Sequence, residues 1–580
     1  MATPKKPTPK KPGTRKPAQD LDQHPRPAAG ERSGAAQAAA QPAGERSSVL
    51  EVLDQHPRPS RPPAKPGARV EALAAEAAAA DQHQCTRTRI RKTGSNGDEN
   101  RYRSFIGNFH KGLKHNEFGE VDRNAYKKMV DILERGRGFE NIPLDLGRKM
   151  TNPQSGLATD VEGPDPKSLE MLAAPRLDSA EEAAEGVELY WMALLRDVPF
   201  IEFGTNPKVA QAAQEISGLK DFTGPKIGGQ VTPQTIFRGC SRGDTVGPFL
   251  SQFLLYDVGY GSLTVSQRQK TVVPAKDYLT KFDEWLHSQN GGAPATGDAF
   301  DPTPRYIRSM RDLGQYVHVD ALYEAYLNAC LILLDHGAPF DPGNPYLPPH
   351  PDSRTQIGFG TFGGPHILSL VTEVATRALK AVWYQKWFVH RRLRPEAYGG
   401  LVHLEKEGTR DYPIHPQVLN SQAVAETRSK FGSYLLPMAF PEGSPTHPSY
   451  GAGHATVAGA CVTILKAWFD DEAGLPASLA PKVANADGTA LVDYTGPDAG
   501  SLTIGGELNK VASNIATGRN IAGVHWRSDY LESIKLGEEV ALFILNKQRR
   551  DYHEKDWSFT LRLFDGRRAT VNRRGVSIER

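Results

Sequence analysis

Two groups of residues in the second half of the chain combine positive charge with features that bind anions. Lys386 is followed eight residues later by Arg394, and Pro395 predicts that a helix ends there, which would leave the arginine at a helix terminus. The segment 447–454 reads His-Pro-Ser-Tyr-Gly-Ala-Gly-His, and its glycines permit a close approach of the backbone. The helix predicted after it would direct free N–H groups and the positive end of its dipole at the same anion.

A third group adds a histidine that could be held by a carboxylate. Gly518 and Arg519 are followed by His525 and, four residues later, by Asp529. If a helix has begun, Asp529 can hold one ring nitrogen of His525 and leave the other as a nucleophile or metal ligand. Arginine offers forked donors and lysine a point charge, so the three groups together would make a strong receptor for a tetrahedral oxyanion.

Each group alone has a simpler explanation. Lys386 and Arg394 could be solvated charges at a helix end. His447 could be a capping or loop residue, and Arg519 and Asp529 could form an ion pair at the surface. The order and spacing of all three groups together favour a binding site.

Four amphipathic patterns would position these groups. Apolar residues recur every three or four positions in the ranges 366–389, 454–468, 507–517 and 528–544. Cofactor sites form between facing helices of a bundle, so we predict an all-α fold of helical bundles. An alternating run at 558–563, a turn at Asp565-Gly566 and a second run at 569–571 predict a small C-terminal β-hairpin.

These patterns divide the chain into three regions. Residues 1–90 are dominated by Ala, Pro, Lys, Arg and Gln, and such a segment cannot offset its ordering entropy by burial, so it is predicted to be a disordered low-complexity tail. Residues 91–340 show helical patterns and Gly/Pro loops without a chemical motif, which indicates an N-terminal helical scaffold. Residues 341–580 would form the helical-bundle catalytic region with the hairpin.

Composition excludes several classes of function. A net charge of only +3 does not support binding to nucleic acid or to a membrane. The four cysteines are widely spaced and form no CxxC pair, which argues against a zinc site and a disulfide framework and predicts free thiols. No apolar core follows the N-terminal lysines, and no run is long enough for a membrane helix, so a soluble, cytoplasmic protein is expected.

The three groups resemble the motif of the vanadium haloperoxidase and histidine acid phosphatase superfamily, which reads Lys…Arg-Pro, Pro-Ser-Gly-His and Ser-Arg…His…Asp. The eight-residue step from Lys386 to Arg394, the run 384–395 (Tyr-Gln-Lys-Trp-Phe-Val-His-Arg-Arg-Leu-Arg-Pro) and Thr-Phe-Gly-Gly-Pro at 361–365 look like the algal and cyanobacterial bromoperoxidase branch. The similarity covers about 355–550. It implies vanadate as cofactor, hydrogen peroxide, halide and small organic acceptors as substrates, and a homo-oligomer.

The resemblance also implies a role for individual residues. His525 would bond to vanadium, with Asp529 behind it. His454 would be the catalytic acid–base group beside the oxygen where peroxide is activated. The oxygens of vanadate would be held by Lys386, Arg394, Arg519 and the backbone N–H of Gly453.

The chain departs from the motif at two positions. Ala452 stands where the motif has serine, and Ser449 is three residues too early to replace it. The missing hydroxyl removes a hydrogen bond to a charged oxyanion, about 1.5–3 kcal/mol, so vanadate would be held more weakly. Gly518 replaces the serine before Arg519, which is a milder change.

Two positions bear on the halide and point in opposite directions. Trp383 is similar to the fungal chloroperoxidase pattern, whereas His447 is similar to the bromoperoxidase pattern. Bromide is the easier halide to oxidise and is therefore expected, with chloride left open. Two other functions also stay open: a histidine acid phosphatase that uses the same pocket, and a catalytically decayed oxyanion-binding or assembly protein.

Overall fold

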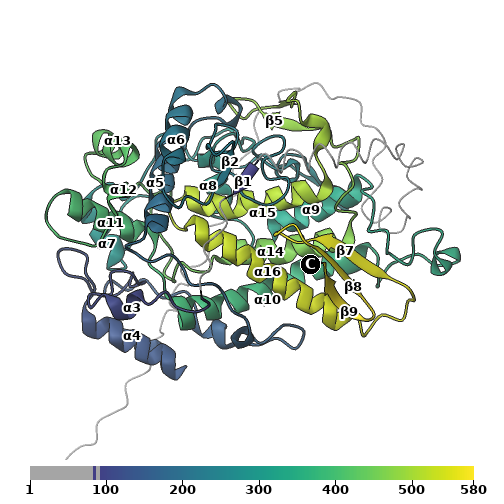
Figure 1. Ribbon diagram of the computed structural model, residues 1–580, viewed down its shortest axis with the longest axis horizontal. Helices are drawn as coiled ribbons and strands as arrows, with labels where there is room; N and C mark the ends of the chain where they lie inside the picture. Colours follow the sequence, from purple (N-terminus) through teal and green to yellow (C-terminus); the bar gives the residue numbers. More distant parts are fainter. Residues whose placement is uncertain (1–82, 86–91, 580) are drawn as a thin grey trace, which may run out of the picture. The chain divides into compact units, whose positions relative to one another are not determined.

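The computed structural model describes residues 83–85 and 92–579, and most of the predicted N-terminal tail lies outside them. In the described part the chain is mainly helical, with four small antiparallel sheets (Figure 1). The predicted class of fold is confirmed.

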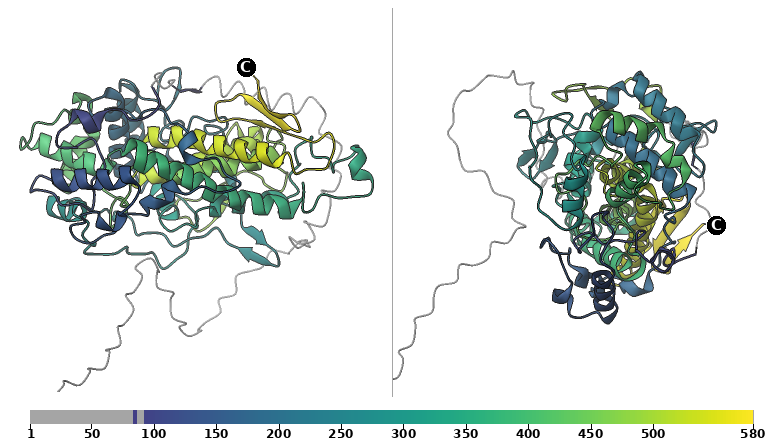
Figure 2. Two further views of the ribbon diagram at one scale, coloured as in Figure 1. Left: turned by 90° about the horizontal axis from the view of Figure 1, so that it is seen from below. Right: turned by 90° about the vertical axis from the view of Figure 1, so that its left-hand side faces the viewer.

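Four long helices form the centre of the molecule and correspond to the four predicted patterns. They are α10 (Gly364–Tyr384), α14 (Gly453–Trp468), α15 (Ile504–Ile521) and α16 (Arg527–Gln548). Helix α14 contacts the other three, and the four helices are neighbours in each view of the molecule (Figures 1 and 2). All but one of the residues of α14 are buried, as expected for the central helix of a bundle.

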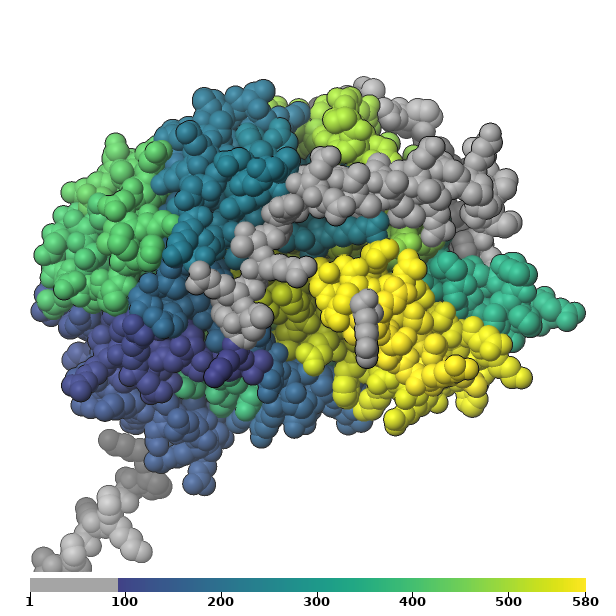
Figure 3. All heavy atoms as spheres, viewed as in Figure 1, coloured from purple at the N-terminus to yellow at the C-terminus, as the bar shows by residue number. Residues whose placement is uncertain are grey.

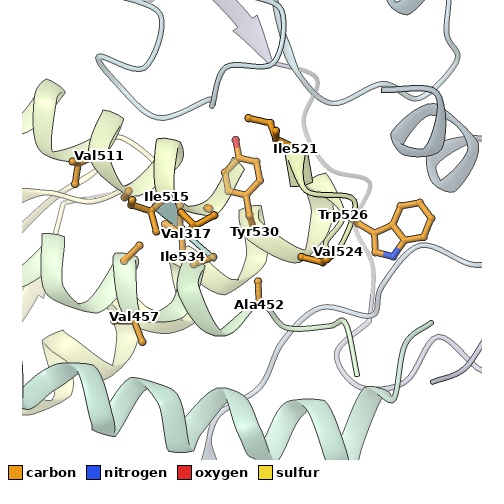
Figure 4. Close-up of a cluster of buried hydrophobic side chains, with 14 of the residues drawn as sticks. Val317, Ala452, Val457, Val511, Ile515, Ile521, Val524, Trp526, Tyr530 and Ile534 are labelled. Carbon is orange, nitrogen blue, oxygen red and sulfur yellow. The ribbon is translucent and has the colours of Figure 1, made fainter. Parts of the chain in front are cut away.

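Glycines allow α14 and α16 to approach closely. A Cβ atom on Gly459 would lie 2.1 Å from the carbonyl oxygen of Ile534, and one on Gly537 would lie 2.0 Å from that of Thr456. Buried apolar side chains of α14, α15 and α16, among them Val457, Ile515 and Ile534, form a cluster that also contains Ala452 (Figure 4). The close approach fixes the start of α14 relative to α16, and both helix starts belong to the site described below.

Local signals set where these helices begin and end. The Thr503 hydroxyl accepts a hydrogen bond from the N–H of Gly506 and caps α15. Helix α10 widens into the π-helical turn η7 (Gln385–His390), after which Arg391 adopts a left-handed φ of 45°. Pro395 was predicted to end a helix, and this was wrong: it begins α11 (Pro395–Lys406), as proline often does in a first turn. Arg394 still lies at a helix terminus.

The remaining helices surround the central group. They are α3 (Asp98–Arg101), α4 (Arg123–Arg135), α5 (Ala180–Leu194), α6 (Pro207–Ser217), α7 (Phe282–Gln289), α8 (Met310–Tyr316), α9 (Glu324–Asp335), α12 (Pro416–Leu419) and α13 (Gln422–Phe431). Helices α5, α8 and α9 contact α15, and one hydrophobic core includes residues from both sides of position 340. The predicted scaffold region therefore packs directly against the helices that carry the motif.

The C-terminal strands form one antiparallel sheet with one strand more than the predicted hairpin. Strands β7 (Ser558–Arg562), β8 (Arg568–Asn572) and β9 (Gly575–Ile578) follow one another, and β7 covers α14 while β8 and β9 contact α16. The sheet forms part of the surface (Figure 3, yellow). The other pairs are β1 (His83–Cys85) with β2 (Pro225–Ile227), β3 (Val258–Tyr260) with β4 (Leu263–Val265), and β5 (Lys482–Ala484) with β6 (Leu491–Asp493).

The cysteines are only partly as predicted. Cys330 and Cys461 are buried free thiols, but Cys240 is disulfide-bonded, so the prediction of free thiols was wrong for this residue. Wide spacing along the chain was a poor guide, because folding can join cysteines that are far apart in sequence. None of the described helices combines the length and apolarity needed to cross a bilayer.

Candidate oxyanion-binding site

Lys386 lies in the π-helical turn η7 and is completely buried. Its Nζ donates to the carbonyl oxygens of Pro448 and Ser449, at 3.0 and 3.1 Å, and lies 5.4 Å from the centre of a Trp383 ring. The segment before α14 is thereby tied to the end of α10. The ammonium group is held in place without a carboxylate partner among the described residues.

Arg394 joins the same segment to the loop before α16. Its Nε donates to the carbonyl of His447 at 2.9 Å and its Nη1 to the carbonyl of Val524 at 2.6 Å. Nη1 also lies 3.1 Å from His525 Nε2, and Nη2 lies 2.8 Å from His447 Nδ1. The guanidinium, 2% exposed, therefore lies directly beside the ring nitrogen that the motif assigns to vanadium.

His525 and Asp529 form the pair expected from their spacing. His525 Nδ1 lies 2.8 Å from Asp529 Oδ2, which also accepts the N–H of Trp526 at 3.1 Å and the Ser449 hydroxyl. This pairing makes Nδ1 the protonated nitrogen and Nε2 the acceptor, which in this structure faces Arg394 Nη1 at 3.1 Å and could instead bind a ligand. We define Lys386, Arg394, His525 and Asp529 as the His525 cluster.

The start of α14 provides backbone donors. The first N–H groups of a helix have no acceptor within the helix, and Ala452, the N-cap residue, makes no side-chain hydrogen bond to them. The N–H of Ala452 itself donates to the Ser533 hydroxyl at 2.7 Å. Because Ser449 is bonded to Asp529, its hydroxyl does not replace the one missing at Ala452.

His454 is the second residue of α14, and its side chain is more exposed than those of the His525 cluster. Its Nε2 lies 3.1 Å from Asp320 Oδ1, and the side chains of the two residues are 20% and 9% exposed. This contact leaves Nδ1 of His454 without a partner among the described residues. We call His454 and Asp320 the His454 pair.

The charge of Arg519 acts on both sets, since it lowers the pKa of Asp320 and that of His525. Its Nη1 donates to the carbonyl of Val317 at 2.7 Å, while its buried Nε has no partner within the described structure. Gly518 explains the approach: a Cβ there would lie 3.0 Å from a methyl group of Val317, so a serine would crowd this contact. The guanidinium also lies 5.2 Å from the Phe440 ring centre.

Burial and mutual repulsion make the positive charges of the site costly without an anion. Burial, followed by the charge of Arg394, lowers the pKa of Lys386 well below its usual value. Burial also lowers the pKa of Arg394, to about 9, and that of Arg519. The pKa of His525 is also lowered well below its usual value, first by burial and then by the charges of Arg394 and Lys386. A bound anion would relieve each of these costs.

The two residues expected to affect the halide lie against each other. The rings of Trp383 and His447 have centroids 4.8 Å apart, and both side chains are 8% exposed. Burial, then the charges of Lys386 and Arg394, lower the pKa of His447 well below its usual value. Both residues therefore present neutral, largely dry surfaces beside the His525 cluster.

Sequence reasoning missed two residues of the site. Asp320 precedes α9 in the region where no motif was found, and no local pattern marks it. Arg392 lies within the quoted run 384–395 but was not singled out; its Nη1 donates to Asp529 Oδ1 at 2.7 Å. Both residues contact partners that are more than 130 residues away in the sequence, so their place became clear only from the structure.

These groups suit a small polyvalent oxyanion. Three buried cations, an unpaired arginine N–H and the uncapped start of α14 supply donors, and His525 supplies a nitrogen ligand. Vanadate fits this donor set. Fold and site together thus define a helical-bundle protein that binds an oxyanion against a histidine.

Comparisons with known proteins narrow this class. The family model of the VCPO second helical-bundle domain matches residues 366–554. Vanadium-dependent bromoperoxidases of Corallina pilulifera and Ascophyllum nodosum are 40% and 36% identical, over 81% and 79% of this chain and 93% and 85% of theirs. The solved homohexameric second vanadate-dependent bromoperoxidase of Ascophyllum nodosum superposes with a TM-score of 0.78 at 31% identity, covering 92% of this chain and 97% of that one.

The chain belongs to the family of vanadium-dependent bromoperoxidases. The predicted resemblance is confirmed.

Proposed function

We propose that this chain is a vanadate-dependent haloperoxidase that oxidises bromide with hydrogen peroxide to hypobromous acid, which then halogenates small organic acceptors. The observation that carries the proposal is the convergence of Lys386, Arg394 and Arg519 on a histidine already oriented by Asp529. Family membership supports the same reaction.

Each residue of the His525 cluster would have a defined part in holding the cofactor. His525 Nε2 would be the vanadium ligand, because Asp529 occupies Nδ1. Lys386, Arg394, Arg519 and the N–H of Gly453 would bind the oxygens of the oxyanion. When bound, vanadate supplies the Lewis-acidic centre at which hydrogen peroxide becomes reactive toward halide.

The His454 pair would move protons. Asp320 accepts at Nε2 of His454 and so leaves Nδ1 to take a proton from peroxide and return it to a leaving oxygen. Burial opposes the charged form of Asp320, but the charges of His454 and Arg519 and the hydrogen bond from His454 hold its pKa below the usual value. Asp320 therefore stays ionised and can stabilise a protonated His454.

Bromide is the proposed halide. The neutral rings of Trp383 and His447 lie side by side, and removing a halide from water costs less free energy for the larger, more weakly hydrated bromide than for chloride. Bromide is also easier to oxidise. Chloride turnover is therefore expected to be slower.

Halogenation of monochlorodimedone by the purified protein with peroxide tests the proposal. Activity with bromide should appear after orthovanadate is added and should be absent in His525→Ala. Hydrolysis of a phosphate ester, inhibited by vanadate and without halogenation at any pH, would instead assign the site to a phosphatase. Neither activity and no bound vanadate would indicate a decayed oxyanion-binding protein.

Assembly and location complete the proposal. A homo-oligomer is proposed, supported by the homohexameric relative, and light scattering of the purified protein would measure its size. The cytoplasmic location stays a prediction. The disulfide at Cys240 favours an oxidising compartment instead.

A further inference from the structure

Arg392 lies at the centre of a buried ionic network that links α5 to the start of α16. It is 3% exposed, and its Nη1 donates to Asp529 Oδ1 at 2.7 Å and to the Ser528 hydroxyl at 2.8 Å. Its Nη2 donates to Glu182 and, at 3.3 Å, to Glu185. One guanidinium therefore connects three carboxylates, two from α5 and one from the His525 cluster.

The two oxygens of Asp529 have different partners. Oδ2 accepts from His525, from the N–H of Trp526 and from the Ser449 hydroxyl. Among the described residues, Oδ1 accepts from Arg392 alone. Because Asp529 is completely buried, loss of this donor would leave Oδ1 without a hydrogen bond and the carboxylate held through Oδ2 alone.

The network keeps Arg392 charged. Burial alone would lower its pKa, but the charges of Glu182, Asp529 and Glu185 raise it. Ser528 strengthens the arrangement, because its N–H and hydroxyl donate to the two oxygens of Glu185 at 3.0 and 2.9 Å. Asp529 is thus held from behind by a rigid group that is anchored in the N-terminal half of the chain.

A second ion pair between the same two helices offers an internal control. Arg527 of α16 binds Glu188 of α5, with 2.8 Å between Nε and Oε2, and both side chains are 1% exposed. Glu182, Glu185 and Glu188 follow one another at three-residue steps along α5. Arg527 makes no contact with Asp529, so its pair shares the burial and the helices of the Arg392 network but not its link to His525.

We propose that Arg392 is a positioning residue of the oxyanion site, which orients Asp529 and, through it, the ring of His525 toward the bound anion. This inference rests on the proposed function and deepens it. Partners one step removed from a metal ligand affect metal affinity because they fix the orientation and basicity of the ligand. Arg392 would do so while anchored to Glu182 and Glu185 of helix α5, which lies in the region where the sequence shows no chemical motif.

The test compares Arg392→Lys with Arg527→Lys in the full-length protein. Both variants should lower the melting temperature of the vanadate-free protein, since each weakens a buried ion pair. Vanadate binding, measured by equilibrium dialysis and metal analysis, should weaken about 10- to 100-fold in Arg392→Lys and stay as in the wild type in Arg527→Lys. Equal affinities in the two variants would overturn the proposal and make Arg392 merely structural.

A milder pair keeps the test decisive if Arg392→Lys does not fold. Glu182→Gln replaces the carboxyl group that accepts from Arg392 with an amide, and Glu188→Gln makes the matching change beside Arg527. We expect weaker vanadate binding only in Glu182→Gln, and the same affinity in both would contradict the proposal.

The wild-type protein separates this inference from the proposed function. Binding of one vanadate per chain supports the function, and the variants then test Arg392. If the wild type binds inorganic phosphate but not vanadate, the haloperoxidase assignment fails while the same comparison is measured with phosphate. Binding of neither anion would overturn both.

Discussion

The His525 cluster and the His454 pair both use a histidine with a carboxylate, but their surroundings differ. His525 is 2% exposed, and Asp529 is fixed by four donors from three parts of the chain. His454 has a side chain that is 20% exposed, and within the described part of the chain its ring is paired with Asp320. A rigid, dry histidine suits a permanent ligand, whereas a partly wet histidine with a free nitrogen suits proton exchange.

This difference predicts that the two histidines control separate quantities. The His525 cluster should set the affinity for vanadate, and the His454 pair should set the turnover rate. Variants of each set test this difference. It would be contradicted if a variant of the His525 cluster changed mainly the turnover rate, or a variant of the His454 pair mainly the affinity for vanadate.

The largest effect is expected for His454→Ala. Loss of a positioned acid–base group should lower kcat for bromide oxidation by about 10²- to 10⁴-fold. Vanadate affinity should change far less, since the cluster that binds the oxyanion stays intact. Steady-state kinetics at saturating vanadate, with metal content measured in parallel, would check this, and loss of the metal together with activity would merge the two roles.

Asp529→Asn should lower the affinity for vanadate and not the turnover rate of the loaded enzyme. The amide keeps the size of the side chain but weakens its hold on His525 Nδ1–H and on Arg392, so vanadate affinity should fall about 10- to 100-fold. Saturating vanadate should restore much of the activity. A variant that binds vanadate normally but turns over slowly would show that Asp529 acts in the reaction step instead.

Ala452→Ser should raise the affinity for vanadate. A hydroxyl at the N-cap of α14 could donate to the oxyanion, and a hydrogen bond to a charged group is worth about 1.5–3 kcal/mol, or roughly tenfold or more in affinity. Titration with orthovanadate would measure the gain. An unchanged or weaker affinity would mean that the hydroxyl points elsewhere, for example toward Ser533.

The smallest effect concerns pH. Burial and Arg394 lower the pKa of Lys386 in the anion-free protein, and a bound anion should raise it, so binding takes up a proton when the pH lies between the lowered and the raised value. Affinity should therefore fall as pH rises, by at most about tenfold per pH unit for this group. Lys386→Gln should bind more weakly and lose this part of the slope, and an identical slope in both proteins would exclude Lys386 as its source.

Residues close together in sequence were predicted well. The four amphipathic patterns became α10, α14, α15 and α16, and the four-residue step from His525 to Asp529 gave a real contact. Local periodicity and spacing contain this information directly. The end of α10 was less predictable, because its π-helical turn, which carries Lys386, leaves no simple apolar pattern.

Contacts between distant segments could not be predicted. Asp320 reaches His454 across 134 residues, and Arg392 reaches Glu182 across 210. The disulfide at Cys240 was missed for the same reason. Such contacts depend on how helices pack, which a single sequence does not reveal, and here they join residues of the predicted scaffold region to His454 and Arg392.

A crystal structure of the protein soaked with orthovanadate, with an anomalous map at the vanadium edge, tests the central claim most directly. The account predicts a single vanadium site bonded to His525 Nε2, with oxygens contacted by Lys386, Arg394, Arg519 and the N–H of Gly453. A vanadium site away from His525, or none in crystals of an active enzyme, would contradict it.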